Sequence, residues 1–245
     1  MQNKCDSHRL FVSTNFARSR ITPKTEAGSQ DETERNWRLI LCLAYGVRVM
    51  EQRRLTTRGK ERRAQLMDQA ARRFAVNGYH PTSVAEIVDE LGVGKGVFYW
   101  YFESKEQLFV EILKDAQLGL RRAQQRSIGN TSDPVERIEH GIHATMKWLS
   151  TNRHLSTLFQ FAATEPTFSP TLQVGLEVGA ADTMRHVTEG MASGRIADAD
   201  PLLVTYAIIG VLNELSRKAI YVRGEDPEQV AKHAVAFCLN GLLAK

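Results

Sequence analysis

Basic side chains are concentrated just before the first helical segment, where they could neutralise the phosphates of a nucleic acid. Six of these side chains fall within residues 53–63: Arg53, Arg54, Arg58, Lys60, Arg62 and Arg63. Residues 51–63 hold six Lys/Arg against two Asp/Glu, whereas residues 64–245 hold 18 against 21. A basic segment ahead of a helix suits an arm on a phosphate backbone, with Arg58 and Lys60 as predicted contacts. A solvated charged face is the alternative interpretation.

Helical periodicity after this arm predicts the elements that would position further DNA contacts. The inward positions of the first helix recur at three- and four-residue steps: Ala64, Met67, Ala71 and Phe74. Asn77-Gly78 ends that helix, and the Ser83/Glu86 spacing of a capping box begins the next one. Gly92 then suits the positive φ of a tight turn.

A short aromatic helix is expected from Gly94 to Phe102. As the second helix of a helix-turn-helix it would lie in the major groove, with Lys95 near a base edge or phosphate. Phe98 and Phe102 are four residues apart and should pack inward, which leaves Tyr99 and Trp100 exposed. Ser104 and Gln107 form another capping-box spacing, and Lys105 at that helix start is placed for a phosphate.

The stretch from Gly78 to Leu108 resembles the DNA-binding domain of the TetR family of transcriptional repressors. The resemblance covers about residues 58–113 and rests on Gly-Tyr, Thr-Ser, Gly-Val, Lys-Gly, Tyr-x-Tyr-Phe and Ser-Lys-Glu-x-Leu in the family's order. It implies an all-α homodimer. A three-helix DNA-binding domain would occupy residues 50–113, and a larger helical ligand-binding and dimerisation domain residues 114–245.

The resemblance also implies roles for individual residues. Phosphate contacts would come from Thr82 or Ser83, Tyr99 and Lys105, and contacts at or near base edges from Lys95, Gly96, Val97 and Trp100. The family usually has Ser or Thr at the position of Gly94, and often Thr, Ser or Ala at that of Val97. Val97 offers only an apolar contact, such as one to a thymine methyl group, so the operator sequence cannot be taken from relatives.

The first 49 residues show no sign of a folded domain. Residues 1–36 are polar and aperiodic, and the apolar run at 37–47 is shorter than the roughly 20 residues of a membrane helix. They are expected to be a disordered extension, with a short helix at 37–49, or to precede a true start at Met50. A signal peptide is not indicated, and the three scattered cysteines fit a reducing cytoplasm, the expected location.

The C-terminal half is expected to consist of helices at about 134–152, 155–164, 170–193, 201–222 and 227–244. The last two are apolar over wide arcs, which favours burial on more than one face. The resembled family uses its final two helices as a two-fold dimer interface, which fits these arcs; a purely intrachain core is the alternative.

An unidentified small-molecule inducer is expected in the C-terminal half. Its candidate contacts are His143, Met146, Trp148, Phe159, Phe161, Glu165, Met184 and Arg185. Aromatic and Met residues at helical spacing are also typical of a plain core. His140 and His143 lack a third ligand, so neither a metal nor another cofactor is expected.

The sequence thus predicts a ligand-released repressor that binds double-stranded operator DNA, with no membrane segment. Enzyme motifs such as Gly-x-Ser-x-Gly, His-Glu-x-x-His and Cys-x-x-Cys are missing, and the glycines at 92–96 complete no nucleotide-binding loop. The alternative function is a small-molecule-binding or partner-docking helical protein that keeps a vestigial helix-turn-helix.

Overall fold

The computed structural model describes residues 55–242, and in this range the predicted all-α fold is confirmed. Its elements are α2 (Thr57–Asn77), α3 (Val84–Asp89), α4 (Lys95–Tyr101), α5 (Lys105–Ile128), α6 (Pro134–Thr151), α7 (Arg153–Thr164), α8 (Ser169–Ala192), α9 (Pro201–Leu215), the π-helix η1 (Ser216–Val222) and α10 (Pro227–Leu242). No helix among the described residues is long and apolar enough to cross a bilayer. The predictions for residues 1–49 lie outside the described range.

The helix ends follow from local residue chemistry. Gly78 (φ 87°) ends α2, and Gly92 (φ 62°) turns the chain between α3 and α4. Ser83 and Glu86 form the predicted capping box, with the Glu86 backbone N–H donating to Ser83 Oγ and the Ser83 backbone N–H donating to Glu86 Oε2.

The second predicted capping box is only half formed. The backbone N–H of Gln107 donates to Ser104 Oγ at 3.1 Å, as expected for a cap. The Gln107 side chain, however, accepts from the backbone N–H of Glu103, one residue before the cap. Ser104 therefore begins α5 without the reciprocal bond.

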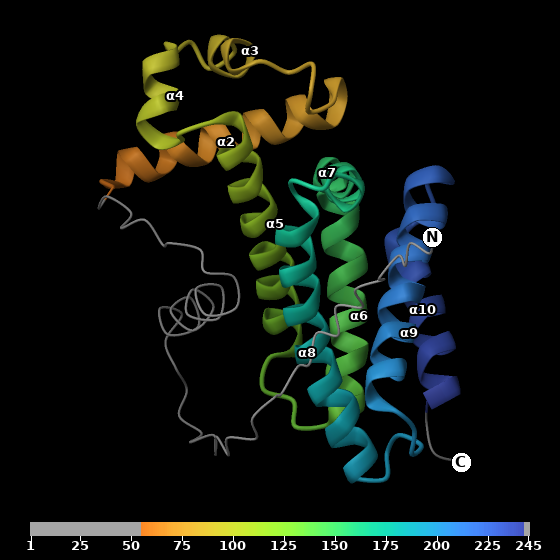
Figure 1. Cartoon of the computed structure of the whole chain (residues 1–245). Helices are drawn as coiled ribbons and strands as arrows, with labels where there is room; N and C mark the ends of the chain where they lie inside the picture. The colour runs from red at the N-terminus through yellow and green to blue at the C-terminus, as the bar shows by residue number, and fades with distance from the viewer. Residues whose placement is uncertain (1–54, 243–245) are drawn as a thin grey trace, which may run out of the picture. The chain divides into compact units, whose positions relative to one another are not determined.

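Two hydrophobic cores share the described residues. The first, here called the head core, is built from α2–α5 together with Leu158 and Ala162 of α7 and with Phe168 and Leu172 at the start of α8. The second, the tail core, draws on α6, the end of α8, α9, η1 and α10. Figure 1 shows α5 running from the helix-turn-helix into the bundle beside α6 and α8. The predicted boundary at 113/114 falls inside α5, and the head core reaches well beyond it.

The predicted helix at 201–222 is interrupted. After Leu215 its hydrogen bonding changes from α to π, and η1 continues the chain to Val222. In η1 the Tyr221 hydroxyl donates to the backbone carbonyl of Leu149 at 3.1 Å and also bonds the Ser156 hydroxyl. These bonds tie η1 to the α6–α7 junction.

Candidate DNA-binding site

Helix α4 presents one apolar and one open face, as a recognition helix requires. Phe98 and the following Phe102 are 0% and 1% exposed, which confirms the predicted inward pair. Tyr99 and Trp100 are 57% and 52% exposed, which confirms the predicted outward pair. Large aromatic side chains gain little from facing water, so their exposure marks a surface that another molecule can cover.

The other predicted base contacts lie at the N-terminal end of α4. Lys95 and Gly96 are exposed, and Val97 is half-buried. Gly94 caps the helix with extended backbone and, lacking a side chain, contributes no capping bond. The N-terminal end of α4 is therefore open to a ligand approaching from outside.

The candidates before α4 divide into exposed and buried groups. Arg58 and Lys60 are exposed in the first turn of α2, while Arg53 and Arg54 lie outside the described residues. Ser83 is exposed at the start of α3, whereas Thr82 is 1% exposed and its hydroxyl donates to the Gly78 carbonyl at 2.7 Å. Of the Thr82/Ser83 alternatives, the structure leaves only the serine hydroxyl accessible.

Lys105, a predicted phosphate contact, has hydrogen-bond partners within the protein. Its ammonium donates to the backbone carbonyls of Tyr79 (3.0 Å), His80 (3.2 Å) and Thr82 (2.9 Å). An ammonium has three N–H donors, so these bonds use its full capacity. Sequence reasoning missed the contact because main-chain acceptors some 25 residues away carry no side-chain signature.

Tyr79 joins the helix-turn-helix to the α7–α8 turn. Its ring is 6% exposed and lies 5.0 Å from Phe168 and 5.5 Å from Phe161, measured between centroids. Its hydroxyl donates to Glu106 Oε1 at 3.1 Å, and burial followed by the Glu106 charge raises the pKa of the phenol well above its usual value. The contact packs the α7–α8 turn directly against the segment that leads into α3.

His80 adds a polar contact to the same junction. Its Nε2 lies 3.5 Å from Oε1 of Glu165, the residue that ends α7. Phe161 and Glu165, which the sequence predicts as ligand contacts, both face the 79–80 segment in the structure.

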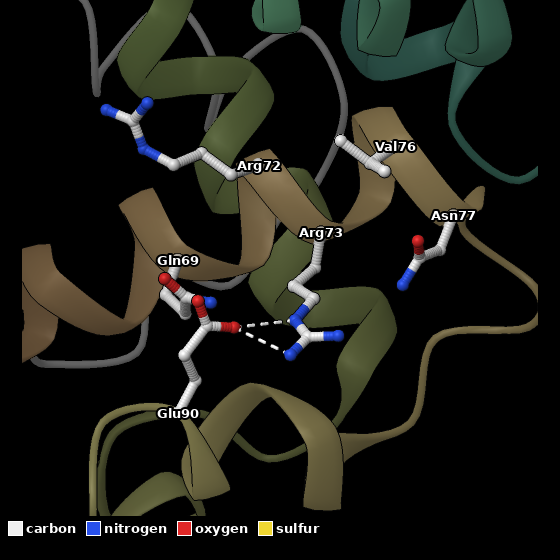
Figure 2. Close-up of a pocket in the computed structure, with 6 residues that line it drawn as sticks. All are labelled: Gln69, Arg72, Arg73, Val76, Asn77 and Glu90. Atoms are coloured by element: carbon white, nitrogen blue, oxygen red, sulfur yellow. Dashed lines mark hydrogen bonds and ion pairs between the residues drawn. The ribbon is translucent and has the colours of Figure 1, made fainter.

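A surface hollow of about 240 Å³ lies beside the end of α2. Figure 2 shows its lining residues: Gln69, Arg72, Arg73, Val76, Asn77 and Glu90. Arg73 reaches across to Glu90 at 2.7 Å and ties α2 to the end of α3 (Figure 2). None of the predicted DNA or ligand contacts lines this hollow.

The remaining predicted ligand contacts do not converge on one place. Trp148 and Phe159 stack with centroids 6.5 Å apart, and Trp148 also covers Gly119 of α5. Met146 is fully buried in the tail core, and His143 Nδ1 faces Glu228 Oε1 at 3.4 Å.

Two further candidates lie on α8. Arg185 points outward and lies 3.9 Å from Asp182, and Met184 is half-buried. Only the Trp148–Phe159 pair therefore forms a compact aromatic wall from the predicted set.

Polar groups that the sequence reasoning missed lie between α5, α6 and α8. Arg121 of α5 forms a two-pronged ion pair with Asp182 of α8, and Gln124 Nε2 donates to Thr145 Oγ1 of α6. Among the described residues, three buried side-chain atoms lack a hydrogen-bond partner: Gln117 Oε1, His140 Nδ1 and His186 Nδ1. They belong to the same three helices, and unsatisfied buried polar atoms are uncommon enough to need an explanation.

Comparison with known proteins agrees with this geometry. Residues 66–112 match the sequence profile of bacterial regulatory proteins of the tetR family. The chain is 24% identical over 195 residues to the HTH-type transcriptional regulator YdgC of Bacillus subtilis, covering 78% of this chain and 97% of that protein. It is 26% identical over 193 residues to the HTH-type transcriptional repressor KstR2 of Mycolicibacterium smegmatis, covering 74% and 90%.

A solved structure shares the fold. The fatty acid degradation regulator FadR from Bacillus halodurans superposes with a TM-score of 0.67 at 20% identity, covering 74% of this chain and 95% of that one.

Proposed function

Because the chain belongs to the tetR family of bacterial regulatory proteins and is a transcriptional regulator rather than an enzyme, we propose that it is a repressor released from its operator by a small molecule. The observation that carries the proposal is α4, which buries Phe98 and exposes Lys95, Tyr99 and Trp100. A short helix with this division fits the major groove.

The proposed contacts divide into two kinds. Lys95, Gly96, Val97 and Trp100 would read base edges, and Arg58, Lys60, Ser83 and Tyr99 would hold phosphates. Base-edge contacts determine sequence preference, whereas phosphate contacts give affinity that falls with salt.

The repressor would act as a homodimer through α9 and α10. Leu202, Leu203 and Tyr206 are 43%, 67% and 52% exposed on α9, and Phe237 is 70% exposed on α10. The small residues Ala207 and Gly210 continue the α9 face and are also exposed. A two-fold interface buries the same patch on both copies, so these helices would pair with their own counterparts. The two helix-turn-helix domains of the dimer would then contact two half-sites about one DNA turn apart.

The inducer would bind among α5, α6 and α8. The unpartnered atoms of Gln117, His140 and His186 support this placement, because a ligand hydroxyl could donate to the Gln117 amide oxygen and bond either imidazole Nδ1. The Trp148–Phe159 pair would supply apolar contact. A relative from Bacillus subtilis is named a fatty acid metabolism regulator, so acyl compounds are the first class to screen.

Fluorescence anisotropy tests the DNA-binding proposal. The full chain is titrated against DNA from upstream of its own gene and against a scrambled duplex, across a salt series. A preference of about 10³-fold or more, with affinity falling steeply as salt rises, is expected for specific binding. If a duplex selected from a random library is bound no better than the scrambled one, the helix-turn-helix is vestigial and the repressor proposal fails.

A further inference from the structure

All three N–H groups of the Lys105 ammonium donate to backbone carbonyls of the segment between α2 and α3. Lys105 is the first residue of α5 and is half-buried, and its three carbonyl partners belong to Tyr79, His80 and Thr82. Charge-assisted hydrogen bonds are stronger than neutral ones, and here three converge on one cation. A phosphate oxygen could gain an N–H from Lys105 only if one of these bonds were broken.

The same ammonium also contacts the ring of Tyr79. Lys105 Nζ lies 4.4 Å from the ring centroid, a favourable cation–π distance. The next residue on α5, Glu106, accepts the Tyr79 hydroxyl. The first turn of α5 therefore contacts Tyr79 in three ways: Lys105 binds the Tyr79 carbonyl and lies against the Tyr79 ring, and Glu106 accepts a hydrogen bond from the Tyr79 hydroxyl.

The segment held by Lys105, residues 79–82, determines where α3 begins. Gly78 has a positive φ, the Thr82 hydroxyl closes back onto the Gly78 carbonyl, and Ser83 then caps α3. Helix α3 packs on α4, which carries the exposed recognition surface. A displacement of residues 79–82 would therefore pass through α3 to α4.

We propose that Lys105 serves DNA recognition as a positioning residue: it holds residues 79–82, and through them α3 and α4, in place without contacting a phosphate. The inference rests on the proposed function, because it concerns how the same helix-turn-helix is prepared for DNA. It assigns to Lys105 a role opposite to that of an exposed phosphate contact such as Lys60.

Two substitutions separate the roles. Lys105→Met removes the charge and all three donors, so both roles predict weaker binding. Lys105→Arg keeps the charge and suits a phosphate, but a planar guanidinium cannot direct three donors at carbonyls that converge on one point. Lys60→Met serves as the phosphate-contact comparison, and Lys147→Met as an exposed charge control on α6.

Anisotropy on the preferred duplex across a salt series gives the first measurement. Lys105→Met and Lys105→Arg are both expected to lose about tenfold or more in affinity, with the salt slope of the wild type retained. Lys60→Met should reduce that slope by about 0.9, the amount for one lost phosphate. Wild-type affinity in Lys105→Arg, with a slope reduced by about 0.9 in Lys105→Met, would overturn the proposal.

Hydrogen–deuterium exchange of the full chain without DNA gives the second measurement. Peptides covering residues 79–91 should exchange faster in both Lys105 variants than in the wild type and Lys147→Met, while peptides of α6 and α8 remain unchanged. Unchanged exchange at 79–91 would refute the holding role even if DNA binding is lost. If the wild type shows no preferred duplex, the proposed function fails and the recognition role fails with it, yet the exchange result still reports separately on the holding role.

Discussion

The head core and the tail core are built from different kinds of side chain. Among the described residues, the buried phenylalanine and tyrosine rings belong to the head core: Phe74, Tyr79, Phe98, Phe102, Phe109 and Phe168. The buried members of the tail core are aliphatic or sulfur-containing, as in Ile142, Met146, Val187 and Leu212. Aromatic pairs favour particular ring orientations, whereas aliphatic side chains tolerate repacking within a constant volume.

This difference matches what the two regions have to do. In the head, one ring sits at the centre: Phe109 of α5 lies 5.6 Å from Phe74, 5.0 Å from Tyr79 and 4.4 Å from Phe168 between centroids. These contacts fix α2, α5 and the start of α8 relative to each other, as a surface that reads DNA requires. The tail instead combines an adaptable interior with an exposed apolar face.

Removing the central ring should have the largest effect. Phe109→Ala is expected to cost about 3–5 kcal/mol of unfolding free energy, because it leaves a cavity among four other rings. Met146→Leu, a similar-volume change in the tail core, should cost less than about 1.5 kcal/mol. Urea denaturation followed by circular dichroism measures both. A loss well below about 3 kcal/mol for Phe109→Ala would contradict its central place in the head core, and a loss above about 1.5 kcal/mol for Met146→Leu would contradict an adaptable tail core.

A charge on the exposed tail face should come next. Leu203→Glu is expected to produce monomers and to weaken binding to a two-half-site duplex by about 100-fold, since a buried carboxylate opposes pairing. Sedimentation velocity gives the oligomeric state. Val76→Glu introduces the same charge at an exposed apolar residue of α2 and should leave the dimer intact. A dimeric Leu203→Glu protein would place the interface elsewhere.

The outer face of the head should respond more modestly. Tyr99→Phe removes one exposed hydroxyl and should weaken binding to specific and scrambled duplexes alike, by about 0.5–1.5 kcal/mol, as for a single phosphate hydrogen bond. Anisotropy with both duplexes measures the change. Tyr101→Phe, on the half-buried side of α4, is the matched control. A loss confined to the specific duplex would move Tyr99 to the base-reading group.

The smallest effect should be a pH dependence in the tail. Burial, reinforced by Arg185, lowers the pKa of the His186 imidazole, so the folded protein favours the neutral form. The unfolded chain binds a proton near pH 6.5, and stability should fall as the pH drops below that value. His186→Leu should reduce the loss of Tm between pH 7 and pH 5.5, measured by thermal denaturation. An unchanged loss would assign the acid sensitivity to other groups, such as His154.

Local signals in the sequence predicted the helices well. The ends at Gly78, Gly92 and Ser83 depend on positive φ or on capping within three residues, and the structure has all three. Ala64 is exposed although the periodicity predicted it inside, because Leu66 and Ala70 occupy the buried stripe beside Met67.

Features that depend on distant contacts could not be predicted in the same way. The periodicity of residues 201–222 fits one helix, and the change to π geometry comes with bonds from Tyr221 to Leu149 and Ser156. The hydrogen bonds of Lys105 go to backbone carbonyls, and because every residue has one, residue types do not reveal these partners. The predicted ligand contacts were chosen by residue type, and type alone did not show that Phe161 and Glu165 face the helix-turn-helix.

The extension of the head core beyond residue 113 affects whether residues 55–113 can be transferred to another protein. The aromatic core is completed by residues that lie later in the sequence, in α7 and at the start of α8: Leu158, Ala162, Phe168 and Leu172. A gene fusion that joined residues 55–113 to a foreign partner would leave Phe109 and Tyr79 without this cover. We therefore expect residues 55–113 to fold poorly as a separate module when α7 and the start of α8 are absent.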